Sequence, residues 1–295
     1  MAMTNYPNGF SGGLSVRGVP VEIIPPNKVY FVQNTIGSDG NKGTKDKPFK
    51  TLDYAIGRCT ASKGDVIFLM PGHAETISAA GTITCDVAGV TIIGLGYGSL
   101  RPTFTWSATD STWLVSAANV TIQNIVCLVS IDSVVMGIDI SAAGCTLDAV
   151  DFQETSSAQM LIFINTAAGA NYLTVKNCYH VQAAAGSAKW IDLVGADWAR
   201  IENNFFHVSA STHILGGTTT ASLQCLVKDN IFVGTYDVAA VVMLANSTGF
   251  AKNNSYGGVK TSQANAFVLA NLYGSGNVST NAVNTNGIVD PAADT

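Results

Sequence analysis

The sequence predicts an all-β fold: a single-stranded, right-handed parallel β-helix of about nine coils. The first observation is a repeat of about 26 residues, in which an aliphatic residue recurs and a small amide or acid usually follows two positions later. The repeated aliphatic residues are Ile92, Ile122, Leu147, Val175, Ile201, Val227 and Ala251. The second observation is composition, because 47% of the residues are apolar and only 12% are charged. Such a chain has ample apolar surface to bury and does not remain disordered.

Each repeat also contains two short segments rich in β-branched and aromatic residues. One segment holds the repeated aliphatic residue, as in 120–125 and 173–178, and the other precedes it, as in 190–194. A unit of this length is too short for a four-stranded propeller blade, and it lacks the helical half of a leucine-rich repeat. Short strands at even spacing with turn residues between them fit one coil of a parallel β-helix.

Four segments are expected along the chain. Residues 1–28 are punctuated by glycine and end soon after Pro25-Pro26, which predicts an extended anchoring arm. Residues 29–64 predict a strand, a Gly-rich loop and a helix with Thr51 at its N-cap, and this helix would cover the open end of the first coil. The parallel β-helix itself spans 65–276, and residues 277–295 form a C-terminal tail or cap.

Composition and spacing exclude several kinds of function. The formal net charge is −5 and no basic run occurs, so we expect no nucleic-acid partner. No apolar stretch approaches the roughly 18 residues of a transmembrane helix, so no membrane association is expected. The histidines lack metal-ligand spacing and no phosphate loop is present, so we expect neither a metal site nor a cofactor. The six cysteines form no C-x-x-C pair, which favours buried free thiols.

Two motifs resemble known protein families. The segment 37–56 has the pattern G-S-D-x-N-x-G-T-x-x-x-P-F-x-T-L-x-x-A-I and is similar to the N-terminal segment of the pectate-lyase-like β-helix superfamily. That superfamily includes lyases, hydrolases, phage tailspikes and inert virion proteins. The segment 6–21, Y-P-N-G-F-x-x-G-L-x-V-R-G-V-P-V, resembles the N-terminal segment of structural proteins of tailed phages. The resemblance therefore implies a β-helix fold and points to a phage particle.

Three columns of residues, each at one position of successive repeats, have structural explanations. The amides and acids Asn124, Asn177, Asn203, Asp229 and Asn253 predict a ladder that satisfies turn groups inside the coil, although a sugar-binding role is also open. The position before them holds Gln123, Asp148, Lys176, Glu202, Lys228 and Lys252, which predicts a ladder of surface charges. A third column, Phe152, His180, Phe206, Phe232 and Tyr256, predicts packed rings, with an exposed carbohydrate platform as the alternative.

One cluster is a candidate for catalysis. Asp148, Asp151 and Glu154 lie on one coil, and Lys176 lies on the next. By resemblance, polysaccharide lyases of this fold need acidic residues that converge on calcium, together with an Arg or Lys base. Hydrolases instead need paired carboxylates across neighbouring coils, and no such pair is evident. We therefore expect no catalytic residues and a chain that is not an enzyme.

These observations favour a structural virion protein of a tailed bacteriophage, most plainly a capsid decoration or cement protein. It would be made in the host cytoplasm and reside in the virion, bound to the major capsid protein or another virion protein. The residues expected to bind this partner are Asn8, Gly9, Phe10, Arg17, Gly18 and Val19 of the arm. The resemblance further implies a homotrimer. The alternatives are a β-helix polysaccharide lyase, a tailspike-type depolymerase or a glycan-binding module, so a surface glycan remains open as a ligand.

Overall fold

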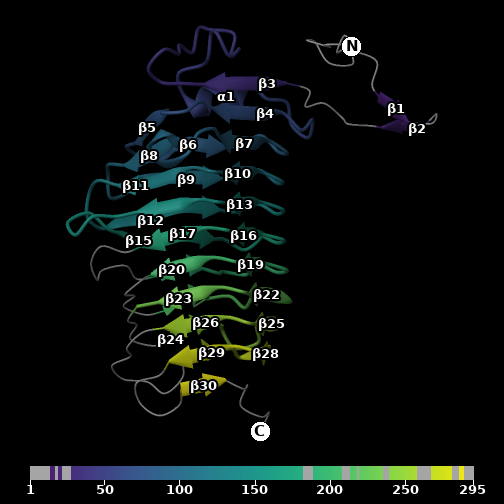
Figure 1. The fold of residues 1–295 in the computed structure, drawn as a ribbon, viewed down its shortest axis with the longest axis vertical. Coiled ribbons are helices and arrows are strands. Elements are labelled where there is room, and N and C mark those ends of the chain that lie inside the picture. Colours follow the sequence, from purple (N-terminus) through teal and green to yellow (C-terminus); the bar gives the residue numbers. More distant parts are fainter. Residues whose placement is uncertain are drawn as a thin grey trace, which may run out of the picture.

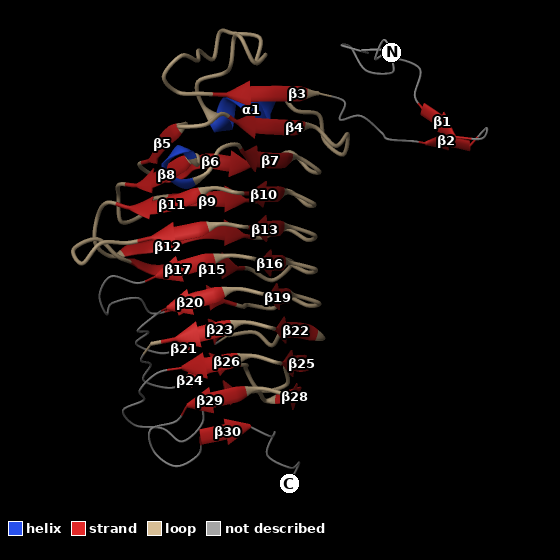
Figure 2. Ribbon diagram, viewed as in Figure 1, coloured by secondary structure: helices blue, strands red, loops and turns tan. Residues whose placement is uncertain are grey.

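The computed structural model describes residues 14–16, 19–21, 28–181, 189–207, 213–217, 219–234, 239–257, 267–280 and 286–288. The protein is an all-β parallel solenoid of the right-handed type with very little helix, which confirms the predicted fold class at this level. Figure 1 shows the strands stacked level upon level along one axis. Figure 2 shows strands on every level, and the helix among the described residues lies near the N-terminal end of the solenoid.

Three sheets form the sides of the solenoid, and each turn from β4 to β27 adds one strand to each of them. The first sheet comprises β3 (Val29–Val32), β4 (Val66–Leu69), β7 (Thr91–Gly94), β10 (Thr121–Gln123), β13 (Thr146–Asp148), β16 (Thr174–Lys176), β19 (Arg200–Glu202), β22 (Cys225–Lys228), β25 (Thr248–Lys252) and β28 (Asn271–Ser275). The second comprises β5 (Ala74–Ile77), β8 (Thr103–Trp106), β11 (Val126–Val129), β14 (Asp151–Gln153), β17 (Tyr179–Val181), β20 (Phe205–His207), β23 (Ile231–Val233), β26 (Ser255–Gly257), β29 (Val278–Thr280) and β30 (Asn286–Ile288), the last antiparallel to β29. The third comprises β6 (Ala80–Cys85), β9 (Thr112–Val115), β12 (Val134–Ile140), β15 (Met160–Thr166), β18 (Lys189–Asp192), β21 (His213–Gly216), β24 (Ala239–Val242) and β27 (Phe267–Val268).

The core consists of columns of buried side chains, and each column runs along one sheet from turn to turn. In the first sheet, the strand register aligns the repeated aliphatic residues from Ile92 to Ala251, and every one of them is buried. In the second sheet, it aligns Phe152, His180, Phe206, Phe232 and Tyr256, which are also buried. The ring centroids of Trp190, from the third sheet, and Phe206 lie 3.8 Å apart. The predicted ring column is therefore interior packing that joins two sheets.

The chain passes from the first sheet to the second through a residue in the left-handed backbone conformation. The recurrent turn residues have φ between 54° and 57°, and they are Asn124, Asn177, Asn203, Asp229 and Asn253. Asn and Asp adopt this conformation more readily than other side chains that have a Cβ. This backbone requirement accounts for the repeated amide or acid in the sequence.

The turn residues lie at or near the surface. Buried amides directly follow Asn203, Asp229 and Asn253, and a fourth buried amide, Asn277, follows Gly276. Asn177 and Asn203 are exposed, and the Asn203 Nδ2 donates to the Asn177 Oδ1 at 2.7 Å. The buried ladder consists of Asn204, Asn230, Asn254 and Asn277, with successive Nδ2-to-Oδ1 distances of 2.9, 3.0 and 2.9 Å. Each of the four Nδ2 atoms also donates to a backbone carbonyl oxygen of a neighbouring turn. The expected interior ladder therefore exists one residue later than the sequence suggested.

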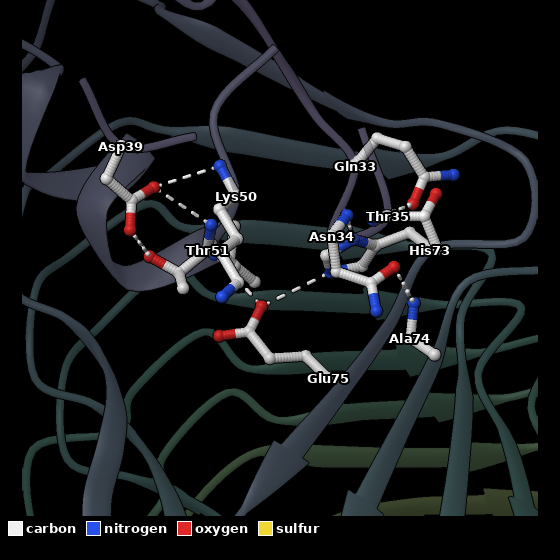
Figure 3. Close-up of polar contacts among 10 residues, drawn as sticks. Gln33, Asn34, Thr35, Asp39, Lys50, Thr51, His73, Ala74 and Glu75 are labelled. Atoms are coloured by element: carbon white, nitrogen blue, oxygen red, sulfur yellow. Dashed lines mark hydrogen bonds and ion pairs between the residues drawn. The ribbon is translucent and has the colours of Figure 1, made fainter. Parts of the chain in front are cut away.

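A polar network organises the N-terminal motif (Figure 3). The Asp39 carboxylate accepts hydrogen bonds from the backbone N–H groups of Lys50 and Thr51 and from the Thr51 hydroxyl, at 2.9 to 3.0 Å. The first N–H of helix α1 (Leu52–Arg58) donates instead to Glu75 Oε2 at 3.0 Å. Thr51 is the N-cap residue, as predicted, but its side chain bonds Asp39 and makes no capping bond.

Helix α1 packs on β3, β4 and β6 and buries Leu52, Ala55 and Ile56. Among the described residues, no helix combines the length and apolar character that crossing a membrane requires. The described part of residues 1–28 is limited to Lys28 and two short strands, β1 (Leu14–Val16) and β2 (Val19–Val21), which pair antiparallel. Asn8, Gly9, Phe10, Arg17 and Gly18 lie outside the described residues, and Val19 begins β2.

Candidate functional site

Four exposed aromatic side chains gather on the outside of the first sheet, two in turns that precede its strands and two in the strands themselves. Tyr172 and Trp198 lie in turns that precede β16 and β19, and 59% and 47% of their surface is exposed. Phe250 lies in β25 and Tyr273 in the adjacent β28, with 47% and 70% exposed. Large apolar side chains usually avoid solvent, so such a gathering marks a surface that binds something.

The backbone conformation sets the positions of the Tyr172 and Trp198 rings. Tyr172 and Trp198 adopt φ of 60° and 63°, which is uncommon for bulky residues. Successive turns hold each other in place, because Tyr172 N donates to Asp197 O at 2.8 Å and Trp198 N donates to Leu223 O at 2.7 Å. The two side chains consequently stack, with ring centroids 6.0 Å apart and an interplanar angle of 14°.

Beyond Trp198 the surface is hollowed. A groove of about 530 Å³, here called the Trp198 groove, is lined by Trp198, Gln224, Thr248, Gly249, Phe250, Asn271 and Tyr273. These residues come from four successive turns, so the groove runs along the solenoid axis for about three strand spacings of about 4.8 Å, or roughly 14 Å. At Gly249, with φ of 136°, any Cβ would collide with the Cys225 carbonyl oxygen, so the backbone itself forms this part of the groove.

The polar groups of the groove are uncharged. The Thr248 hydroxyl accepts a hydrogen bond from Gln224 N at 3.0 Å. The side-chain amides of Gln224 and Asn271 form no hydrogen bond with other residues in the described part of the chain, and both residues are exposed. Lys252 contacts a lining ring, and its Nζ lies 4.7 Å from the Phe250 ring centroid. Aromatic faces beside free amides are suited to ligands that carry both C–H surfaces and hydroxyl groups.

The predicted catalytic cluster is divided between two places. Asp148 belongs to the charge column of the first sheet, whose predicted register from Gln123 to Lys252 is present. Its Oδ2 lies 3.5 Å from Lys176 Nζ, and its Oδ1 accepts a hydrogen bond from Asn177 Nδ2 at 2.7 Å. The contacts of Asp148 and Lys176 are therefore those of a surface ladder.

Asp151 and Glu154 lie at a second, smaller hollow on the second sheet. This hollow of about 360 Å³ is also lined by Phe152, Gln153, Tyr179 and Val181. Asp151 Oδ2 accepts from Gln153 Nε2 at 2.9 Å and lies 3.4 Å from the Arg101 guanidinium. Arg101 also donates to the carbonyl oxygens of Ile125 and Ala149, so it links three successive turns.

Glu154 is oriented inward. Its side chain is fully buried, accepts the N–H of Met160 at 2.7 Å, and approaches His180 Nε2 at 3.7 Å. Burial lowers the pKa of His180 to about 4, although the hydrogen bond to the Phe152 carbonyl oxygen opposes this shift. His180 is thus a neutral core residue at pH 7, as its place in the ring column suggested. No group of three or more His, Cys, Asp or Glu side chains in the described ranges is arranged to hold a metal ion.

Sequence reasoning missed the Trp198 groove. Trp106, Trp113 and Trp190 are fully buried, whereas Trp198 is 47% exposed. A signal was present, because Tyr172 and Trp198 are 26 residues apart, which is the repeat length. A glycan-binding module could use loops such as 183–189 or 216–221, of which residues 183–188 and 218 lie outside the described residues.

No protein-family profile matches the chain, and no curated protein matches it in sequence. Among solved structures it is similar to a GH136 lacto-N-biosidase from Eubacterium ramulus, at 12% identity and a TM-score of 0.50, over 86% of this chain and 55% of that one. It is also similar to a rhamnogalacturonan lyase, at 12% identity and a TM-score of 0.46, over 89% of each chain. A third is ORF18 of Geobacillus virus E2, at 11% identity and a TM-score of 0.45, over 84% and 62%.

The chain spans little more than half the length of the lacto-N-biosidase, and at these identities the likeness shows the fold alone. It nevertheless corrects one prediction. The expectation that the chain is not an enzyme is contradicted, because the structurally similar proteins include a GH136 lacto-N-biosidase. The parallel solenoid is therefore a fold that this chain shares with that enzyme.

Proposed function

We propose that this protein recognises a glycan through the Trp198 groove. The observation that carries the proposal is the Trp198 ring, which has one face against Tyr172 and also lines a groove with the exposed residues Gln224 and Asn271. Sugar rings offer C–H faces to aromatic rings and hydroxyl groups to amides. A groove that runs along the axis suits an extended chain of sugars.

The test is retardation of the protein in native gels that contain a polysaccharide. Calorimetry then measures the affinity for each polysaccharide that retards the protein. Trp198→Ala should weaken binding about tenfold or more, because an aromatic anchor in a groove commonly contributes above 1.4 kcal/mol. Tyr97→Ala is the matched control, since Tyr97 is 90% exposed and does not line the groove. Equal binding by the Trp198→Ala variant and the wild type would refute the proposal.

Cleavage of the bound glycan is the second candidate. The observation that favours it is the hollow at Asp151, where a carboxylate, the Arg101 guanidinium and the exposed Tyr179 ring lie together. The same polysaccharides should then be shortened on incubation, with new reducing or unsaturated ends. Asp151→Asn should abolish this release while binding at the Trp198 groove persists. Release that is unaffected by Asp151→Asn would exclude this hollow as the site.

The setting we propose for this glycan recognition is the virion of a tailed bacteriophage, with the chain acting as a capsid decoration or cement protein. The support is the resemblance of residues 6–21 to phage structural proteins. Residues 1–28 then act as the arm that binds the major capsid protein, α1 covers the first of about nine coils, and three copies associate. Each of these features belongs to the proposal.

Co-sedimentation with phage shells tests this setting. The full chain should sediment with shells, whereas a chain that begins at Lys28 should stay folded by circular dichroism and remain in the supernatant. Sedimentation velocity of the free full chain gives its mass, and the mass of one chain would exclude the trimer. Failure of both chains to bind shells would exclude the decoration role and leave glycan recognition to be judged separately.

A further inference from the structure

We infer that the ligand of the Trp198 groove is an uncharged glycan, one of whose pyranose rings stacks on the face of Trp198 that Tyr172 leaves open. This inference rests on the proposed glycan recognition and adds the class of glycan and the place of one sugar ring. It also gives Tyr172 a role as a positioning residue.

The lining of the Trp198 groove carries no charge, which favours an uncharged ligand. None of its seven lining residues is an acid, a lysine or an arginine. The lysines of the neighbouring strands are engaged, since Lys252 lies over the Phe250 ring and Lys228 Nζ lies 2.9 Å from Asp229 Oδ2. A polyanionic glycan would require cations to replace its hydration, and the net charge of −5 would oppose its approach. An uncharged glycan meets no such cost.

The column of stacked rings ends at Trp198, which leaves a place for a ring of the ligand. Tyr172, Trp198 and Gln224 occupy one position of three successive turns, and all three have φ near 60°. The first two rings stack, but the third position holds a slender amide in place of a ring. On the following turn Thr248 lies in register with Gln224, and the adjacent Gly249 carries no side chain. The column of rings therefore stops at Trp198, and a ring-shaped ligand can continue it above Gln224.

Tyr172 acts through Trp198. It does not line the groove, yet its ring lies almost parallel to the indole. The indole of Trp198 is 47% exposed and stacks on Tyr172, so Tyr172 supports one face of the indole while Trp198 lines the groove. Replacement of Tyr172 by leucine should weaken glycan binding several-fold and lower the fluorescence anisotropy of Trp198.

Quenching of tryptophan fluorescence by acrylamide tests the inference directly. Trp198 is the exposed tryptophan, whereas the other three are buried, so quenching reports on this ring. The probes are dextran and galactomannan as neutral glycans and polygalacturonate as an acidic one, at physiological ionic strength. At least one neutral glycan should lower the quenching of the full chain to the level of Trp198→Phe, and polygalacturonate should not. Lys252→Gln and Arg200→Gln should leave the neutral glycan's affinity within twofold.

The outcomes are distinct. Protection by polygalacturonate alone, lost in Lys252→Gln or at high salt, overturns the uncharged class and leaves glycan recognition standing. Binding of a neutral glycan without protection of Trp198 overturns the stacking position. Protection by none of the glycans, together with no retardation in polysaccharide gels, overturns both this inference and the proposed function. Unchanged affinity and anisotropy in Tyr172→Leu, with Tyr97→Leu as the control, removes the positioning role.

Discussion

At the scale of single residues, neighbouring asparagines in this chain do different work. In three successive turns an amide or acid at a left-handed position is followed at once by a buried asparagine, as in Asn203-Asn204 and Asp229-Asn230. The first satisfies a backbone conformation and faces solvent, so glycine can replace it. The second bonds neighbours above and below inside a dry core, where an unmatched partner is costly.

Asn230→Leu should therefore lower the free energy of unfolding by roughly 1–3 kcal/mol, because Asn204 Nδ2 and the Ile201 carbonyl oxygen lose their partner. Asn203→Gly is the matched control, and it should change stability by less than about 0.5 kcal/mol. Urea unfolding measures both variants. Equal losses in the two variants would show that the interior ladder contributes no more than the exposed one.

His180 makes stability depend on pH. Burial lowers its pKa from 6.5 to about 4, so the unfolded chain binds a proton that the folded chain does not between these values. Stability from this residue is complete above pH 6.5 and is lost as the pH falls towards 4. Between pH 7 and pH 4 the wild type should lose on the order of 3 kcal/mol more than His180→Gln, which cannot titrate. Parallel losses in urea unfolding at the two pH values would contradict this assignment.

At the scale of elements, the N-terminal motif is held by two carboxylates, those of Asp39 and Glu75. Asp39 bonds two backbone N–H groups and one hydroxyl at the start of α1, and Glu75 bonds the next N–H (Figure 3). The G-S-D pattern therefore shapes the loop through Asp39, and both carboxylate oxygens are already used by the protein. No ion is needed to explain the presence of this residue.

Asp39→Ala should destabilise the protein by roughly 2–3 kcal/mol, because three hydrogen bonds to a charged acceptor are lost. Asp39→Asn keeps an acceptor for the two N–H groups and should cost about half as much. Hydrogen exchange of the α1 amides should accelerate in the alanine variant before that of β13 or β16. Exchange that accelerates equally everywhere would place the effect in global stability.

The sequence predicted these elements unevenly, for physical reasons. The aliphatic and ring columns were predictable, because a buried column must repeat the same class of residue on every turn. The buried amides were placed one residue early, because only the backbone φ decides which asparagine of a pair faces inward. The Trp198 groove was missed because it draws on two different columns, each aromatic for only two turns.

At the scale of the whole molecule, the solenoid is a row of turns that contact mainly their neighbours. Stability in such a row resembles a sum of turn and interface terms, so the ends open before the middle. Local opening of the turns can be measured with the six cysteines, which are all free and are spread along the axis. They are Cys59, Cys85, Cys127, Cys145, Cys178 and Cys225. Burial raises the pKa of Cys59, Cys85, Cys178 and Cys225 to about 12, so labelling requires local opening.

In native protein treated with iodoacetamide, Cys59 and Cys225 should therefore be labelled before Cys127 and Cys145. Cys59 is the least buried of the six, and Cys225 lies toward the C-terminal end. Mass spectrometry of peptides at intervals gives the order, and labelling in mild urea tests whether it holds as the turns loosen. Simultaneous labelling of all six would mean that the solenoid opens as one cooperative unit.

The buried asparagine ladder has a consequence for how such a chain grows. Because Asn204, Asn230 and Asn254 each present the same donor and acceptor to the next level, a duplicate of residues 204–229 inserted before Asn230 would find its partners already in place. Tandem duplication would thus lengthen the molecule by one strand spacing, about 4.8 Å, without redesign of either end. The ladder therefore allows the length of the solenoid to change by duplication in fixed steps of one turn.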